Sequence, residues 1–208
     1  KRQMHDCDLL INIGARFDDR ITGKIDEFSP KSKKVHIDID PSSINKIIKV
    51  DLAIVGDVNE VLKSTIKKIN QKQNGIKVSN KQKISKWWEQ IQKWREKDSL
   101  GFINSDKTIK PQHAVQRLYE LTKSQDTFIT TEVGQHQMWA AQHYKFNKPN
   151  RWMTSGGLGT MGYGLPAAVG VQIAHPDKLV IDIAGEASVL MTMQEISTAV
   201  QYLSLIHI

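Results

Sequence analysis

Two segments of the chain combine residue types that suit a pocket for a large, flat, phosphorylated ligand. Gly134–Trp139 places amide, imidazole, thioether and indole side chains within six consecutive positions. Ser155–Pro166 is dense in glycine, which has no Cβ and therefore lets the backbone approach a ligand closely. His136 stands in what we expect to be a loop. Because Met138 and Trp139 follow it closely, His136 is a better candidate for the wall of a cofactor pocket than for an isolated surface residue.

A carboxylate, Glu186, follows the apolar run Lys178–Ala184, which predicts a strand. Mg²⁺ is usually held by one or two carboxylates together with phosphate oxygens, so Glu186 is a candidate metal ligand beside a diphosphate. Ser188 could add a hydrogen-bond donor at the start of the next helix. An ordinary Gly-Glu turn with a capping serine is the alternative interpretation.

Gly157–Gly162 also satisfies the dinucleotide fingerprint G-x-G-x-x-G, and Asp182 stands about twenty residues further on. The elements on either side of this segment do not suit a dinucleotide-binding loop. The preceding Arg151–Ser155 is a marginal strand, and Pro166 falls in the first turn of the following helix. The sequence therefore disfavours nicotinamide binding at this loop.

Glycine and acidic residues follow three apolar runs near the start of the chain, at Gly14–Asp18, Asp38–Asp40 and Gly56-Asp57. Parallel α/β sheets bind ligands at the carboxyl ends of their strands. Acidic side chains there can accept hydrogen bonds from ribose or ribityl hydroxyls, and Arg16 could pair with a phosphate. This is a nucleotide-site pattern, although Asp and Gly are also common in plain turns.

The elements that must position these residues alternate along the chain. Leu9–Ile13, Val35–Ile39 and Leu52–Val55 are short apolar runs bounded by turn residues, which predicts strands. Their nearly continuous apolar character predicts a parallel sheet covered on both faces. We expect helices over Pro41–Lys49 and, with a clear apolar stripe, over Val58–Ile69.

The second half of the chain alternates in the same way. The elements expected there are a helix from Pro111, a strand over Asp126–Thr131, a helix over Pro166–Ala174, the strand Lys178–Ala184 and a helix over Gln194–Tyr202. This alternation predicts an α/β fold with two doubly wound parallel-sheet domains. Both are expected to be incomplete, as in an internal fragment of a longer protein. We expect a first domain over residues 1–70 and a second domain over residues 111–208. Residues 71–110 would form a linker and a connecting helix between them.

The connecting region has two parts. Asn70–Gln82 is polar and contains Asn74-Gly75, which predicts a linker. Apolar residues then recur at helical spacing, and a tryptophan stripe of this kind indicates a packing face in a core or between domains. The stripe consists of Ile84, Trp87, Trp88, Ile91 and Trp94.

Composition narrows the class of protein. The chain has 208 residues with 39% hydrophobic and 25% charged residues, ordinary for a globular protein. It lacks a run of 18 apolar residues, so we expect no membrane span. The single cysteine, Cys7, excludes an internal disulfide and indicates a reducing, cytoplasmic compartment. We expect Cys7 itself to be a buried or incidental residue.

The formal net charge of +7 raises the hypothesis of nucleic-acid binding. The lysines, however, crowd into residues 63–97, where only three tryptophans interleave with them. A solvated helix face with a linker is the simpler interpretation, and we expect no nucleic-acid partner.

Several of these strings together closely resemble the large catalytic subunits of the acetohydroxyacid synthase (acetolactate synthase) family, which are thiamine-diphosphate enzymes. The resemblance extends from about Asp8 to Tyr202, whereas Leu203–Ile208 do not match the family. The strings that carry it are Gly14–Gly23, His36–Pro41, Val55–Val58, Gly134–Trp139 and Ser155–Pro166.

The resemblance implies two cofactor sites. FAD would contact Gly14, Ala15, Arg16, Phe17, Asp18, Asp38, Ile39, Asp57 and Val58, together with Met138, Trp139, Gly156 and Gly157. Thiamine diphosphate would contact Gln135, His136, Gly159, Thr160, Met161, Glu186, Ala187 and Ser188. The Mg²⁺ ligand in this chain would be Glu186, where the family usually has an aspartate. Glutamate reaches one methylene further and Mg²⁺ demands near-ideal octahedral geometry, so this departure affects the metal site.

The implied reaction is decarboxylation of pyruvate and condensation with a second 2-oxoacid, pyruvate or 2-oxobutyrate, in branched-chain amino-acid biosynthesis. FAD would have a structural part, and the subunit would form a homodimer or tetramer with a small regulatory subunit. In this family the activating glutamate comes from the N-terminal domain of the partner subunit. We therefore expect no catalytic residue in this chain and no activity from it in isolation.

Besides a basic nucleic-acid binder, which would associate in a steeply salt-dependent way and is the most distant option, two alternatives stay open from the sequence. One is another thiamine enzyme, such as a glyoxylate carboligase, a 2-oxoacid oxidase or an oxalyl-CoA decarboxylase, which the long match at Gly14–Gly23 disfavours. The other is a non-catalytic nucleotide-binding module, which would bind a cofactor without releasing carbon dioxide.

Overall fold

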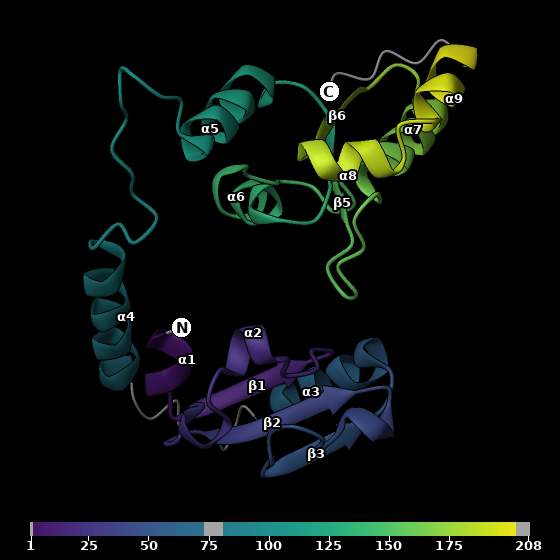
Figure 1. Ribbon diagram of the computed structural model, residues 1–208. Coiled ribbons are helices and arrows are strands. Elements are labelled where there is room, and N and C mark those ends of the chain that lie inside the picture. The colour runs from purple at the N-terminus through teal and green to yellow at the C-terminus, as the bar shows by residue number, and fades with distance from the viewer. Residues whose placement is uncertain (1, 73–80, 203–208) are drawn as a thin grey trace. The chain divides into compact units, whose positions relative to one another are not determined.

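The computed structural model describes residues 2–72 and 81–202. The chain divides into two compact units, Lys1–Asp98 and Ser99–Ile208, each built on a three-stranded parallel sheet with helices (Figure 1). The expected α/β class with two parallel sheets is confirmed. Among the described residues, the helices are too short or too polar to cross a membrane.

The sheet of the first unit has the strand order β1-β2-β3. β1 (Leu9–Ile13), β2 (Lys33–Asp38) and β3 (Leu52–Val55) confirm the three predicted strands. All three are parallel, so their carboxyl ends lie at one edge of the sheet. That edge therefore collects the residues that follow each strand.

The helices of the first unit are α1 (Arg2–Asp6), α2 (Asp19–Thr22), α3 (Val58–Lys72) and α4 (Lys81–Arg95). α3 confirms the helix predicted from Val58 and continues three residues beyond Ile69. The predicted linker Asn70–Gln82 overlaps the end of α3 and the start of α4. Its central part lies outside the described residues.

The helix predicted over Pro41–Lys49 is wrong, because only a 3-10 turn forms at Pro41–Ser43. The Asp40 carboxylate accepts hydrogen bonds from the backbone N–H of Ser42 at 2.8 Å and from its hydroxyl at 2.7 Å. Asn45 then takes a φ of 57°, and its side-chain oxygen accepts the N–H of Val50 at 2.9 Å. These local side-chain bonds compete with helical ones and reverse the chain.

The largest buried cluster of the first unit lies on one face of its sheet, and Ile37 of β2 is buried on the other face. Phe17, Phe28 and Ile48 form the buried cluster, and Leu10 packs against it. On β1 the alternate residues Leu9, Ile11 and Ile13 remain 50%, 53% and 43% exposed. The expectation of a sheet covered on both faces is therefore wrong for β1 within this unit.

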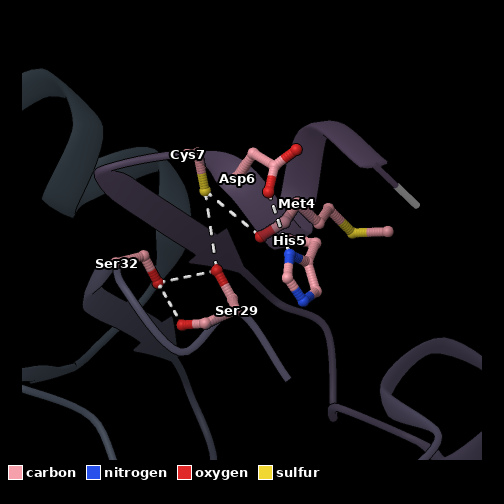
Figure 2. A network of polar contacts seen from close by, with 6 residues as sticks. All are labelled: Met4, His5, Asp6, Cys7, Ser29 and Ser32. Atoms are coloured by element: carbon pink, nitrogen blue, oxygen red, sulfur yellow. Dashed lines mark hydrogen bonds and ion pairs between the residues drawn. The ribbon is translucent and has the colours of Figure 1, made fainter. Parts of the chain in front are cut away.

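Cys7 joins α1 to β1 and takes part in a small polar network (Figure 2). Its Sγ–H donates to the Met4 carbonyl at 3.3 Å and lies 3.6 Å from the Ser29 hydroxyl. Ser29 in turn donates to the Ser32 hydroxyl at 2.8 Å. The partly buried thiol thus has structural contacts, in agreement with the interpretation of Cys7 as an ordinary structural residue.

The tryptophan stripe lies on α4, which confirms the predicted helix. Trp87 and Trp94 contact each other edge to face, with ring centroids 5.6 Å apart. Ile91 is buried, whereas Ile84 and Trp88 are about half exposed. The stripe acts as a packing face at its centre.

The sheet of the second unit has the order β5-β4-β6, again parallel, with β4 (Thr127–Thr131), β5 (Trp152–Thr154) and β6 (Leu179–Ile183). Its helices confirm those predicted from Pro111, around Pro166 and before Tyr202. They are α5 (Pro111–Thr122), α6 (Gln135–His143), α7 (Gly164–Ala174), α8 (Glu186–Met191) and α9 (Glu195–Gln201).

The loop expected around His136 is wrong, because Gln135–Gln137 form the first turn of α6. Gly134 takes a φ of 153°, which favours glycine and lets the chain pass from β4 into the helix within a few residues. Gly134 also leaves room for the imidazole of His136, whose Cε1 would lie 2.8 Å from a Cβ at that position.

Helices cover both faces of the second sheet. On one face Ile129 and Ile181 pack with Val115 of α5. On the other face Phe128 and Val180 pack with Ala168 of α7. The doubly wound arrangement predicted from the alternation of elements is present in this unit.

An ionic cluster around Asp126 ties the amino ends of the three strands together. Arg151, which precedes β5, holds the Asp126 carboxylate at 2.7 and 3.1 Å. Lys148 lies 3.4 Å and Lys178, just before β6, lies 3.8 Å from the same carboxylate. The hydrogen bond from Arg151 is the main reason why the pKa of Asp126 lies well below its ordinary value.

We expect Asp126→Asn to lower the thermal unfolding midpoint at neutral pH. The lowered pKa means that the stabilisation by this carboxylate is present above its unfolded value of 3.8 and is lost as the pH falls through the lower folded value. The difference between wild type and variant should therefore shrink below pH 3.8. Thermal unfolding of the full-length protein across that range measures it, with the exposed Asp177→Asn as the control. A difference that does not change with pH contradicts the ionic explanation.

Candidate functional site

Three loops of the second unit meet at the carboxyl edge of its sheet. β4 leads into α6, β5 into the glycine-rich loop, and β6 into α8 (Figure 1). Thr131 pairs with both Thr154 and Ile183, so the three strands end level with one another. The structure therefore brings the residues expected to contact thiamine diphosphate to one edge. They are Gln135 and His136, then Gly159, Thr160 and Met161, then Glu186, Ala187 and Ser188.

The imidazole of His136 lies between the starts of α6 and α8. A Cβ on Gly185 would approach its Cε1 to 3.3 Å, so the ring packs directly against the turn before Glu186. Burial lowers the pKa of His136, although the nearby charges of Glu132 and Glu186 oppose this effect. The Nε2 atom is buried and finds no hydrogen-bond partner within the described residues. His136 thus offers a neutral ring with one unused nitrogen.

Side-chain oxygens accept two backbone N–H groups of the glycine-rich loop between β5 and α7. The Ser155 hydroxyl accepts the N–H of Thr160 at 2.9 Å. The Glu132 carboxylate accepts the N–H of Gly162 at 2.7 Å. Gly159 and Gly162 take φ values of 76° and 82°, which side chains rarely adopt, so the loop needs glycine at both positions.

The side chains of this loop project outward. Leu158 is 91% exposed and Met161 is 40% exposed. Exposed apolar side chains at the same sheet edge as His136 and Glu186 give the mixed character expected of a site that receives a ring system and a diphosphate.

Gln137 fixes the first turn of α6 to the sheet. Its Nε2 donates to the Thr154 hydroxyl at 2.6 Å, which the Thr131 hydroxyl also approaches at 2.6 Å. Neither Gln137 nor Glu132 was predicted as a site residue from the sequence. The available signal was that Glu132 directly follows β4 and that Gln137 lies in the first turn of the next helix, both at the carboxyl edge of a parallel sheet.

Glu186 is the first residue of α8 and is exposed, whereas Ser188 is buried. Across the described chain, no three His, Cys, Asp or Glu side chains come together as a metal site. A cation at Glu186 would therefore need ligands from a bound phosphate group, which is how Mg²⁺ is commonly held.

The first unit has a second candidate site at the carboxyl edge of its sheet. Gly14–Asp18 follows β1, Asp38-Ile39 ends β2, and Asp57-Val58 follows β3. The N–H of Gly14 donates to the Ile37 carbonyl at 2.8 Å, and the N–H of Gly56 donates to the Asp38 carbonyl at 3.0 Å. These bonds hold the three segments side by side.

The acidic residues of this edge already have structural bonds. Asp18 accepts the N–H of Arg20 at 3.0 Å, and Asp57 accepts the N–H of Asn59 at 2.9 Å, each at a helix start. Asp38 accepts the N–H of Asp40 at 2.9 Å. A carboxylate has further lone pairs, so each can still accept a hydrogen bond from a ligand hydroxyl.

Phe17 differs from its neighbours because its side chain turns away from the edge. It is 7% exposed and contacts the rings of Phe28 and His36 at centroid distances of 5.8 and 5.1 Å. Its φ of 54° is uncommon for a residue other than glycine. Only the backbone of Phe17 is left to meet a ligand.

The other residues expected to contact FAD belong to the second unit. Met138 on α6 is 54% exposed, whereas Trp139 packs against the core cluster of that unit. Gly156 and Gly157 lie in the loop after β5.

Two family models match this chain. The central domain of thiamine pyrophosphate enzymes matches residues 1–65, and the C-terminal TPP binding domain of the same enzymes matches residues 132–208. The chain belongs to the thiamine pyrophosphate enzymes. The two matches contain the two strand edges described above, one in each unit.

Within the thiamine pyrophosphate enzymes, the chain is similar to acetolactate synthase large subunits. It is 45% identical over 199 residues to the subunit of Haemophilus influenzae and 44% identical over 199 residues to the isozyme 3 subunit of Escherichia coli K12. Each match covers 96% of this chain and 34% of the relative. The subunit of Porphyra purpurea is 48% identical over 197 residues, 95% of this chain and 32% of the relative. The resemblance seen in the sequence is confirmed, and the chain spans about a third of the length of these relatives.

Proposed function

We propose that the protein is the catalytic subunit of an acetolactate synthase. This transferase decarboxylates pyruvate and joins the remaining two-carbon unit to a second 2-oxoacid. The observation that carries the proposal is the gathering of His136, the glycine-rich loop and Glu186 at one sheet edge. With pyruvate as the second acid the product is acetolactate, and with 2-oxobutyrate it is acetohydroxybutyrate, in the synthesis of branched-chain amino acids.

Thiamine diphosphate with Mg²⁺ fits the residues at this edge. The Nε2 atom of His136 is buried without a hydrogen-bond partner among the described residues, so a bound ligand could supply one. Glu186 offers a carboxylate oxygen, the type of ligand that Mg²⁺ prefers. Thiamine diphosphate, when bound, supplies the electron sink for decarboxylation. The chain's own part is to orient the diphosphate through His136 and Glu186 and to shield the ring system with Met161.

FAD is assigned to the edge formed by Gly14–Asp18, Asp38-Ile39 and Asp57-Val58. Acidic acceptors for ribityl hydroxyls and a flexible glycine support this assignment, as does the match to the central domain of the family. Met138, Trp139, Gly156 and Gly157 are proposed to contact FAD from the second unit. The role of FAD in this proposal is structural.

The proposed partners follow from the same family. The relatives are named large subunits, which supports a small regulatory subunit for this protein as well. We propose a homodimer or tetramer in which the activating glutamate comes from the partner subunit, so that this chain supplies cofactor-binding residues. A cytoplasmic location agrees with the single cysteine.

Substrate profiling of the full-length protein tests the proposal. Acetolactate should form from pyruvate only when thiamine diphosphate and Mg²⁺ are present. A preference for glyoxylate would identify a glyoxylate carboligase instead. Cofactor binding without release of carbon dioxide would identify a non-catalytic nucleotide-binding module.

We expect Glu186→Asp to tighten Mg²⁺ binding in the presence of thiamine diphosphate. The shorter carboxylate matches the residue usual in the family, and Mg²⁺ demands near-ideal octahedral geometry, so we expect a gain of about tenfold in affinity, or about 1.4 kcal/mol. A Mg²⁺ titration of cofactor binding by the full-length protein measures the change. Glu195→Asp on α9 is the matched control. Weaker Mg²⁺ binding by Glu186→Asp would mean that the site is shaped for glutamate.

A further inference from the structure

Glu132 is a buried carboxylate that the proposed reaction does not use. It directly follows β4 and is 0% exposed. It accepts three backbone N–H groups, from Gly162 at 2.7 Å, Gly164 at 2.8 Å and Leu165 at 3.2 Å. Burying a carboxylate is costly unless it is hydrogen-bonded, and bonds to a charged acceptor are the stronger kind.

The three donors lie where the glycine-rich loop becomes α7. The first N–H groups of a helix have no partner within the helix, so another group must satisfy them. Glu132 does so for Gly164 and Leu165 from a strand about thirty residues earlier in the chain. Its carboxylate therefore joins the end of β4 to the first turn of α7.

This connection also sets the shape of the loop. Thr160 is held by the Ser155 hydroxyl and Gly162 by Glu132, so Met161 stands between two anchored amides. The Ser155 anchor is local, whereas the Glu132 anchor fixes the loop to the sheet. Loss of the second anchor would free the end of the loop next to α7 from its bond to the end of β4.

We infer that Glu132 is a positioning residue for the cofactor: its carboxylate holds residues 159–162 in the shape that receives thiamine diphosphate. This inference rests on the proposed function, which places that cofactor against Gly159, Thr160 and Met161. Glu132 acts through the backbone of the loop and does not itself touch the ligand in this role.

Glu132→Gln in the full-length protein tests the inference. Glutamine keeps the size of the side chain but replaces one acceptor oxygen by an N–H₂ group. In the cofactor-free protein, hydrogen exchange at the amides of Gly162, Gly164 and Leu165 should speed up about tenfold, as expected for loss of one charge-assisted bond. The Kd for thiamine diphosphate, measured calorimetrically with saturating Mg²⁺, should rise by a similar factor, about tenfold. The kcat at saturating cofactor should change less than the affinity.

Two further variants complete the test. Glu120→Gln removes an exposed glutamate that pairs with Arg117 on α5, and it should leave both exchange and affinity unchanged. Glu132→Asp keeps the charge but shortens the reach, and it should give intermediate values. If Glu132→Gln does not fold, the exchange rates and the cofactor affinity of Glu132→Asp test the inference instead.

The outcomes separate the inference from the proposed function. Faster exchange with unchanged cofactor affinity would make Glu132 purely structural and overturn the positioning role. Unchanged exchange would overturn the anchor itself. If the wild type does not bind thiamine diphosphate, the proposed function fails and the positioning role fails with it. The exchange data would still report whether Glu132 holds the turn.

Discussion

Replacement of Gly164 by alanine is expected to destabilise the second unit by about 3 kcal/mol or more, at the upper end of the range for overpacked cores. A Cβ at this position would lie 2.5 Å from the Asp182 carboxylate, 2.8 Å from the Glu132 nitrogen and 2.9 Å from the Thr131 carbonyl carbon. The Thr131 atom is backbone of the central strand β4, the Glu132 nitrogen directly follows that strand, and the Asp182 oxygen belongs to a short buried side chain. None can move without separating α7 from β4 and β6.

Thermal unfolding of the full-length Gly164→Ala protein measures this effect. Gly170→Ala on the same helix is the matched control, because a Cβ there would meet open space: apart from its chain neighbours and the adjacent backbone of α7, no described atom lies within 4 Å. Alanine has a higher helix propensity than glycine, so the control should be more stable than wild type by up to about 1 kcal/mol. Equal midpoints for the two variants would contradict the crowding seen at Gly164.

The strands were predictable because their signal is local. Leu9–Ile13 and Leu52–Val55 are nearly continuous apolar runs between turn residues, and β1 and β3 have the same bounds. The parallel pairing follows from the alternation with helices. The gathering of the candidate site at the carboxyl edges then follows from the topology alone.

The predictions from sequence are wrong where a side chain competes with the backbone for hydrogen bonds or where a group distant in sequence decides the local conformation. Asp40 and Asn45 divert the segment after Pro41 from a helix. Gln137 and Gly134 turn an expected loop into the start of α6, through a bond to Thr154 and an unusual φ. Such effects have no periodicity for sequence analysis to detect.

Some features of the candidate site also follow from topology, whereas others depend on contacts between residues distant in the sequence. The position of His136 near Glu186 follows from neighbouring parallel strands. The anchoring role of Glu132 does not, because its donors lie thirty or more residues away in the sequence. Phe17 belongs to a string that resembles flavin contacts, yet its ring lies in the core, since the backbone at φ 54° turns it inward.

Asp182 is expected to make the second unit less stable as the pH rises from about 4 to about 6. Burial is the main cause that raises the pKa of Asp182 to about 6, and the charge of Glu132 adds to it, while the hydrogen bond from Thr130 opposes it. In the unfolded chain the carboxyl loses its proton near 3.8, whereas the folded protein retains it until about 6. The cost of ionising it in the fold is therefore absent below the unfolded value and complete above pH 6.

Asp182→Asn should remove this pH dependence and make the protein more stable than wild type at neutral pH. The two-unit difference in pKa corresponds to about 3 kcal/mol at most. Asparagine can still accept the Thr130 hydroxyl bond that Asp182 Oδ1 accepts at 2.8 Å. Its amide nitrogen would replace Oδ2, an oxygen that has no hydrogen-bond partner in the part of the chain that the structure describes. Urea unfolding of the full-length protein between pH 4 and pH 8 measures how the free energy of unfolding changes with pH.

The exposed Asp177→Asn is the control for Asp182→Asn, since it removes a carboxylate near the start of β6 without altering a buried group. Thr130→Val offers an independent check. It deletes the O–H donor that favours the ionised form, so the upper limit of the pH window should rise while the lower limit stays at the unfolded value. If the stability of the wild type did not fall between pH 4 and pH 6, the pKa of Asp182 would not be raised and its carboxyl would be ionised in the fold. The buried edge shared by Glu132, Thr130 and Gly164 would then accommodate two negative charges.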